Sequence, residues 1–193
     1  KALIFTDCHL NRFNPFHETF PFFKEQLLAI VEKEAVNTVI LLGDVVHIRV
    51  EGAAEKIEQV LRIFENLPVK VYYVSGNHDR HIATKMSFPK TSNITVVRDI
   101  SLCFVHPSPL PGTPPRIFLT HDLRNHHKLK LHEIKQWHAF LRKTFAGLIN
   151  PDDYLLTGHT HETVVDDETR SASVAPYSLD LMIKAYAILT MTN

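Results

Sequence analysis

Five short apolar runs, each ended by a polar cluster, constrain the fold of this chain more than any other feature. They are rich in β-branched and aromatic side chains and occupy residues 2–6, 36–42, 69–74, 116–120 and 153–157. Runs of this length predict strands that are buried on both faces. Helical patterns in residues 22–35 and 53–67 separate the first three runs, which predicts that those strands pair in parallel.

The segments between and after these runs complete the expected fold. Residues 132–148 have a third helical pattern, with an inner face of Ile134, Trp137, Leu141, Phe145 and Leu148. Residues 94–106 form short alternating pieces with almost no linker, which predicts an antiparallel hairpin, and residues 163–175 continue this style. We expect a single α/β domain over residues 1–193, a mixed-sheet β-sandwich flanked by helices.

Charge and cysteine content narrow the classes of partner. The 21 Lys and Arg balance the 21 Asp and Glu, whereas an extended nucleic-acid surface is usually basic, so nucleic acid is not the favoured substrate. No run approaches the roughly 18 apolar residues of a membrane span, so no membrane contact is expected. Cys8 and Cys103 are too few for a disulfide framework, which favours a cytoplasmic location. The sequence does not indicate an oligomeric state.

The polar clusters that end the five runs are rich in metal-ligand side chains. Loops at the carboxyl ends of parallel strands converge, so these clusters are expected near one point. Any one Asp-x-His or His-x-His pair also fits an ordinary turn or cap, and only the combination favours a metal site. The seven candidate ligands are Asp7, His9, Asp44, Asn77, His121, His159 and His161.

The chemistry of these seven ligands predicts two metal ions. Carboxylate oxygens and imidazole nitrogens without thiolates suit manganese, iron, zinc or nickel. Seven ligands are too many for one tetrahedral ion, whereas a shared carboxylate allows two ions about 3.5–4 Å apart. Asp44, which follows Gly43 at the end of the second run, is well placed to be shared. We expect two divalent cations, with manganese as the first choice.

The series DCH, GDVVH, GNHD, TH and GHTH, in this order over nearly the whole chain, resembles the calcineurin-like metallophosphoesterases. The resemblance implies a four-layer α/β/β/α sandwich and hydrolysis of a phosphate ester, as a phosphodiesterase or a phosphomonoesterase, by a hydroxide that bridges two metals. It further implies that one metal is held by Asp7, His9, Asp44 and His161, and the other by Asp44, Asn77, His121 and His159.

The same resemblance assigns a role to the residues that follow Asn77. His78 would face the substrate and stabilise phosphoryl charge or protonate the leaving group, and Asp79 would orient its ring. His47 and Arg80 sit beside the motifs and are candidate substrate contacts. The alternative function is a protein-interaction scaffold on the same fold with little or no catalysis. A scaffold is free to lose ligands, whereas every expected position here carries a competent residue.

Overall fold

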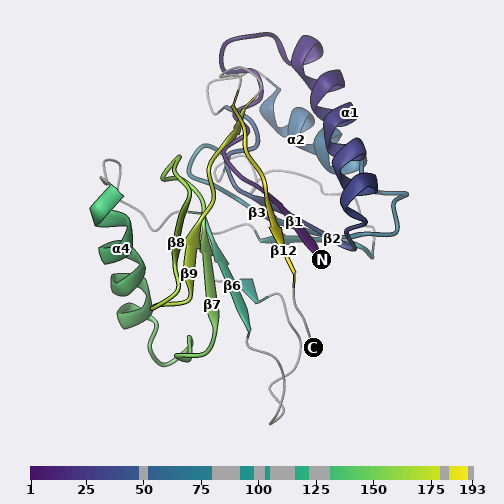
Figure 1. Ribbon diagram of the computed structural model, residues 1–193. Helices are drawn as coiled ribbons and strands as arrows, with labels where there is room; N and C mark the ends of the chain where they lie inside the picture. The colour runs from purple at the N-terminus through teal and green to yellow at the C-terminus, as the bar shows by residue number, and fades with distance from the viewer. Residues whose placement is uncertain are drawn as a thin grey trace.

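The computed structural model of the chain describes residues 1–47, 52–79, 92–97, 103–104, 116–121, 131–178 and 183–190. In these residues two five-stranded sheets lie between helices, as Figure 1 shows. The expected α/β class and the mixed-sheet sandwich flanked by helices are therefore confirmed. Within the same residues, no helix has the length and apolar character needed to cross a bilayer.

The first sheet carries the first three predicted strands. Its strand order is β12-β1-β2-β3-β4, and the strands are β1 (Ala2–Phe5), β2 (Thr38–Leu42), β3 (Lys70–Val74), β4 (Ile94–Val97) and β12 (Ala187–Leu189). Strands β1 to β4 pair in parallel, and β12 pairs with β1 antiparallel. The parallel pairing predicted for the first three runs is confirmed.

The second sheet carries the fourth and fifth predicted strands at its centre. Its order is β5-β6-β7-β9-β8, with β5 (Cys103–Phe104), β6 (Ile117–Thr120), β7 (Tyr154–Thr157), β8 (Val164–Asp166) and β9 (Ser171–Ser173). Strands β6, β7 and β9 are parallel, and the β8–β9 pair is antiparallel as predicted. A separate pair joins β10 (Tyr177–Ser178) and β11 (Ile183–Lys184).

Strands β1 and β2 are buried on both faces, and their successive side chains point to opposite sides of the first sheet. Leu3 and Phe5 pack in a cluster with residues of helices α1 (Phe16–Glu34) and α2 (Ala53–Arg62). Ile4, between them, packs instead with Leu119 and Leu156 of the second sheet. A third cluster joins the second sheet to helix α4 (Leu131–Thr144) and contains Phe118, Trp137, Leu141, Ile149 and Leu155.

Two predictions about these elements are wrong. Residues 94–106 do not form a hairpin, because β4 extends the first sheet beside β3 whereas β5 pairs with β6 in the second sheet. The two pieces therefore belong to different sheets. Leu148 was expected on the inner face of the third helix but is 48% exposed. The helix ends at Thr144, and Ile149 is buried in its place.

Candidate functional site

The candidate ligands gather where strands of both sheets end. Asp7 and His9 follow β1, Asp44 follows β2, Asn77 follows β3, His121 follows β6, and His159 and His161 follow β7. Two groups have ligand atoms within 4.8 Å of one another: Asp7 with His9 and His161, and Asp44 with His121 and His159. The structure thus brings together side chains that are up to 154 positions apart in the sequence, from 7 to 161.

The backbone at these residues has an unusual conformation. Five of the seven have a positive φ, which is 51° at Asp7, 45° at His9, 52° at Asp44, 66° at His159 and 58° at His161. For residues with a Cβ this region is costly, at about 1–3 kcal/mol each, and such residues cluster at functional sites. Local conformational cost is therefore concentrated at the candidate site.

Glycines beside the ligands are required by close packing. A Cβ at Gly43 would overlap the ring of His121, and one at Gly76 would overlap the carboxylate of Asp44. At Gly158 a Cβ would overlap the hydroxyl of Thr6. At Gly43 and Gly76 the backbone therefore lies directly against the side chain of a candidate ligand.

The Asp7 carboxylate is held on one side and open on the other. Its Oδ2 lies 2.6 Å from Thr6 Oγ1 and accepts a hydrogen bond from the backbone N–H of His159 at 2.9 Å. Its Oδ1 lies 3.2 Å from His161 Nε2, 3.7 Å from His121 Nε2 and 3.9 Å from His9 Nε2. Thr6, which sequence reasoning missed, therefore orients this carboxylate toward three imidazoles.

The Asp44 carboxylate lies between the two groups. Its Oδ1 accepts a hydrogen bond from the backbone N–H of His78 at 2.8 Å. Its Oδ2 lies 3.2 Å from His121 Nε2 and 3.9 Å from both His9 Nε2 and His78 Nε2. One oxygen of Asp44 thus faces a histidine of each group, which is the position a shared ligand requires.

Burial and opposite charges shift the pKa values at the centre. Burial lowers the pKa of His121, but the Asp44 and Asp7 carboxylates outweigh it and raise this pKa to about 10. Burial raises the pKa of Asp44, yet His121 holds it well below its ordinary value. Beside Asp7, the pKa of His161 is raised. The two carboxylates therefore make a strongly anionic, buried centre that attracts positive charge.

The buried polar atoms fit a cation site. Within the described part of the chain, His9 Nδ1 and Asn77 Oδ1 are buried without a hydrogen-bond partner. Leaving such an atom unsatisfied costs about 1–3 kcal/mol. Carboxylate oxygen, amide oxygen and imidazole nitrogen are all donors for manganese, iron, zinc or nickel. The residues present thus suit divalent cations.

The predicted substrate-facing residues occupy the edge of this centre. The side chain of His78 is 27% exposed, and its ring lies 4.8 Å from the ring of His47. Asp79 is fully buried and accepts hydrogen bonds from the backbone N–H groups of Val45 and Gly76. Burial and the Asp44 charge raise the pKa of Asp79 to about 6. Arg80 lies outside the described residues.

Asp79 contacts the backbone of two loops that carry candidate site residues. Two of its hydrogen bonds join the loops after β2 and β3. Asp79 thus holds the backbone on which Asp44 and His78 are carried.

Comparison with known proteins identifies the family. A sequence profile of the calcineurin-like phosphoesterase superfamily domain matches residues 1–192. The chain therefore belongs to the calcineurin-like phosphoesterase superfamily, a class of metal-dependent hydrolases that act on phosphate esters. No curated protein sequence matches the chain significantly.

Solved structures of low sequence identity are similar to this chain. A dimetal phosphatase from Danio rerio is 11% identical, with a TM-score of 0.53 over 96% of this chain and 90% of that one. Yfce, a phosphoesterase from E. coli, is 19% identical, with a TM-score of 0.47 over 89% and 76% of the two chains. The nuclease MPE from Pseudomonas putida is 21% identical, with a TM-score of 0.45 over 86% and 64%.

Proposed function

We propose that this protein hydrolyses a small phosphate ester at a centre that holds two divalent cations. The observation that carries the proposal is the pair of adjoining groups, Asp7 with His9 and His161, and Asp44 with His121 and His159. Each group combines a buried carboxylate with imidazoles from separate loops. Ordinary turns or caps do not require this convergence.

The ligand assignment follows the two groups. Asp7, His9, Asp44 and His161 would hold one ion, and Asp44, Asn77, His121 and His159 the other. Bound together, such ions supply Lewis acidity that can lower the pKa of a water molecule to about 7 and offset phosphate charge. Manganese is the first choice, because carboxylate oxygens face both sites and suit it, with iron, zinc or nickel as alternatives.

His78 is proposed to act on the substrate. Its backbone N–H is fixed to Asp44 while its ring is partly exposed, so the ring can reach a phosphoryl or leaving-group oxygen. A donor in this position contributes roughly 100-fold to 10,000-fold to the rate. His47, whose ring centroid lies 4.8 Å from that of His78, is proposed to contact the same substrate, and Asp79 is proposed to position the loop that carries His78.

A small ester is favoured over nucleic acid because the sequence has no basic excess. The test is to strip the protein with a chelator, add back manganese, iron, zinc or nickel, and assay a panel of aryl monoesters and diesters. We expect no hydrolysis without metal and recovery with manganese. Equal activity in chelated protein would refute the proposal, and the panel decides between monoester and diester.

The second candidate is an interaction scaffold with the same fold. It is disfavoured because potential ligand atoms at the centre, such as His9 Nδ1 and Asn77 Oδ1, are buried without a hydrogen-bond partner within the described residues. A scaffold has no reason to retain this cost in stability. The same panel tests it. A protein that binds metal but hydrolyses none of the esters would support the scaffold.

A further inference from the structure

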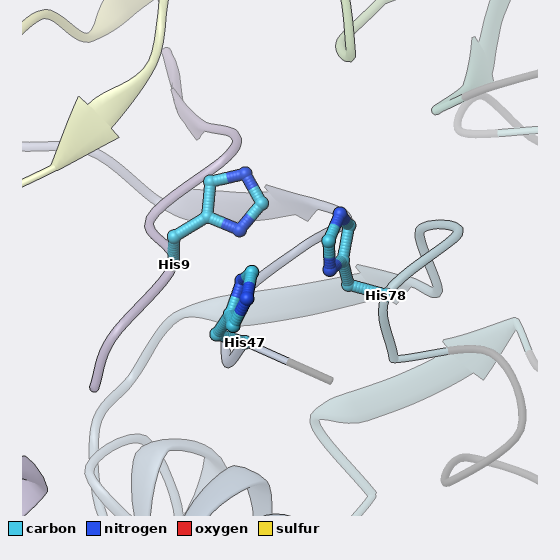
Figure 2. A group of neighbouring side chains, drawn as sticks. All are labelled: His9, His47 and His78. Atoms are coloured by element: carbon cyan, nitrogen blue, oxygen red, sulfur yellow. The ribbon is translucent and has the colours of Figure 1, made fainter. Parts of the chain in front are cut away.

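A third group of ligand side chains lies beside the two that contain carboxylates, and it consists of imidazoles alone. One ring nitrogen of each of His9, His47 and His78 lies within 4.8 Å of the others. The ring centroids are 5.7 Å apart for His9 and His47, 4.9 Å for His9 and His78, and 4.8 Å for His47 and His78. Figure 2 shows the three rings gathered around one point.

The backbone holds this imidazole group in place. Its members follow three adjacent parallel strands, β1, β2 and β3. The N–H of His9 donates to the Asp44 carbonyl oxygen at 2.9 Å, and the N–H of His47 donates to the Leu10 carbonyl oxygen at 3.2 Å. The N–H of His78 donates to Asp44 Oδ1 at 2.8 Å. Each of the three imidazole rings is therefore attached to a backbone position that a hydrogen bond holds in place.

We propose that His9, His47 and His78 form a third cation site that takes zinc or a similar borderline metal. Nitrogen-only donors suit zinc, nickel and copper, whereas manganese and magnesium prefer carboxylate oxygens. Within the described residues the Nδ1 atoms of His9 and His78 are buried without a hydrogen-bond partner. Asp44 Oδ2, 3.9 Å from the Nε2 of both residues, adds the negative charge that favours a cation.

The imidazole group shares residues with the proposed catalytic centre. His9 also belongs to the group of Asp7 and His161, and His78 is proposed to face the substrate. Zinc on the three imidazoles therefore withdraws His78 from the substrate. Excess zinc inhibits the enzyme, and excess manganese does not. This inhibition rests on the proposed function, whereas zinc binding itself does not.

The test compares wild-type protein with His47→Asn, which removes one imidazole from the third group and none from the other two groups. Chelated protein is saturated with zinc, freed of unbound metal and analysed for zinc per chain. Wild type is expected to hold about three ions and His47→Asn about two. In parallel, excess zinc is expected to lower manganese-supported hydrolysis about 100-fold in wild type, the contribution of an acid group. The variant should lose this inhibition relative to its own manganese activity.

The matched control is His17→Asn, because the His17 side chain is 81% exposed and belongs to none of the three groups. It should behave as wild type. Zinc soaked into wild-type crystals should give an anomalous peak between the three rings, a result that does not depend on a variant folding. Only two zinc ions per wild-type chain, or inhibition without a peak at the rings, would overturn the site. A third zinc in a protein that hydrolyses no ester would leave the site standing and the proposed function refuted.

Discussion

His121 Nδ1 lies 2.6 Å from the carbonyl oxygen of Leu42, so the last residue of β2 orients the histidine that follows β6. A carbonyl only accepts, so the ring must carry its proton on Nδ1 when neutral. Nε2 is then left with its lone pair, 3.2 Å from Asp44 Oδ2. A backbone contact of this kind fixes the tautomer that a metal ligand needs.

Thr6→Val is expected to weaken metal binding without unfolding the protein. The change keeps the shape of the side chain but removes the hydroxyl that lies 2.6 Å from Asp7 Oδ2 and 2.8 Å from the Leu42 carbonyl oxygen. Loss of such an outer contact typically lowers metal affinity about 10-fold to 100-fold. Manganese titration measures this. Thr19→Val, at a buried threonine of α1, is the control, and equal affinity in the two variants would contradict the role of Thr6.

Asp44→Ala and His78→Ala should separate metal binding from turnover. Removing the shared carboxylate of Asp44 should reduce the manganese bound per chain. His78→Ala should keep both manganese ions yet lose roughly 100-fold or more in kcat, as expected for an acid group. Elemental analysis and steady-state assays of the two variants check this. Full turnover in His78→Ala would remove that residue from the reaction.

Gly76→Ala should disrupt the site through a single methyl group. A Cβ at this position would overlap both the carboxylate and the backbone nitrogen of Asp44, so Asp44 or the loop after β3 must shift. We expect loss of metal binding and a lower melting temperature. Gly147→Ala is the matched control, because a Cβ there meets nothing within 4 Å. Two variants with the same metal content would show that the close approach is tolerated.

The buried His138 should make stability depend on pH. Its ring contacts the hydroxyls of Thr157 and Ser173, each at 3.2 Å, and burial lowers its pKa from 6.5 to about 4. Below pH 6.5 the unfolded chain gains a proton that the folded chain does not take up until about pH 4. The free energy of unfolding therefore falls across this range as pH falls, by roughly 2 kcal/mol at about pH 5.

Urea unfolding of chelated protein near pH 7 and near pH 5 measures this effect. His138→Gln keeps a polar group but does not titrate, so its stability should fall less between the two conditions. His17→Gln controls for the loss of one histidine on the surface. Parallel pH dependence in wild type and His138→Gln would show that His138 does not contribute.

Much of the fold could be predicted from the sequence because its signals are local. The runs around Ile4, Ile40 and Tyr72 are apolar without alternation, and strands buried between two layers have this pattern. The hairpin prediction for residues 94–106 failed because alternation predicts a strand but not the sheet it joins. The prediction that Leu148 is buried failed because the apolar periodicity continues past Thr144, the residue at which the helix ends.

The convergence of the candidate ligands could be predicted, and their detailed geometry could not. Asp7, Asp44 and His121 stand at strand ends in the sequence, so convergence follows from parallel topology. The left-handed backbone at Asp7 and Asp44, and the roles of Thr6 and Asp79, depend on which loops touch across the two sheets. Glycine before Asp44, Asn77 and His159 was the one available sign of that close approach.

Both groups of candidate ligands that contain a carboxylate draw on the two sheets of the sandwich, since Asp7 and His9 belong with His161, and Asp44 with His121 and His159. A cation bound by either group would cross-link loops from the two sheets. Metal binding would therefore also stabilise the packing of the two sheets. Every tenfold excess of free metal over its Kd adds about 1.4 kcal/mol to the free energy needed to separate them. Removal of the metal would therefore lower the stability of the fold together with the activity.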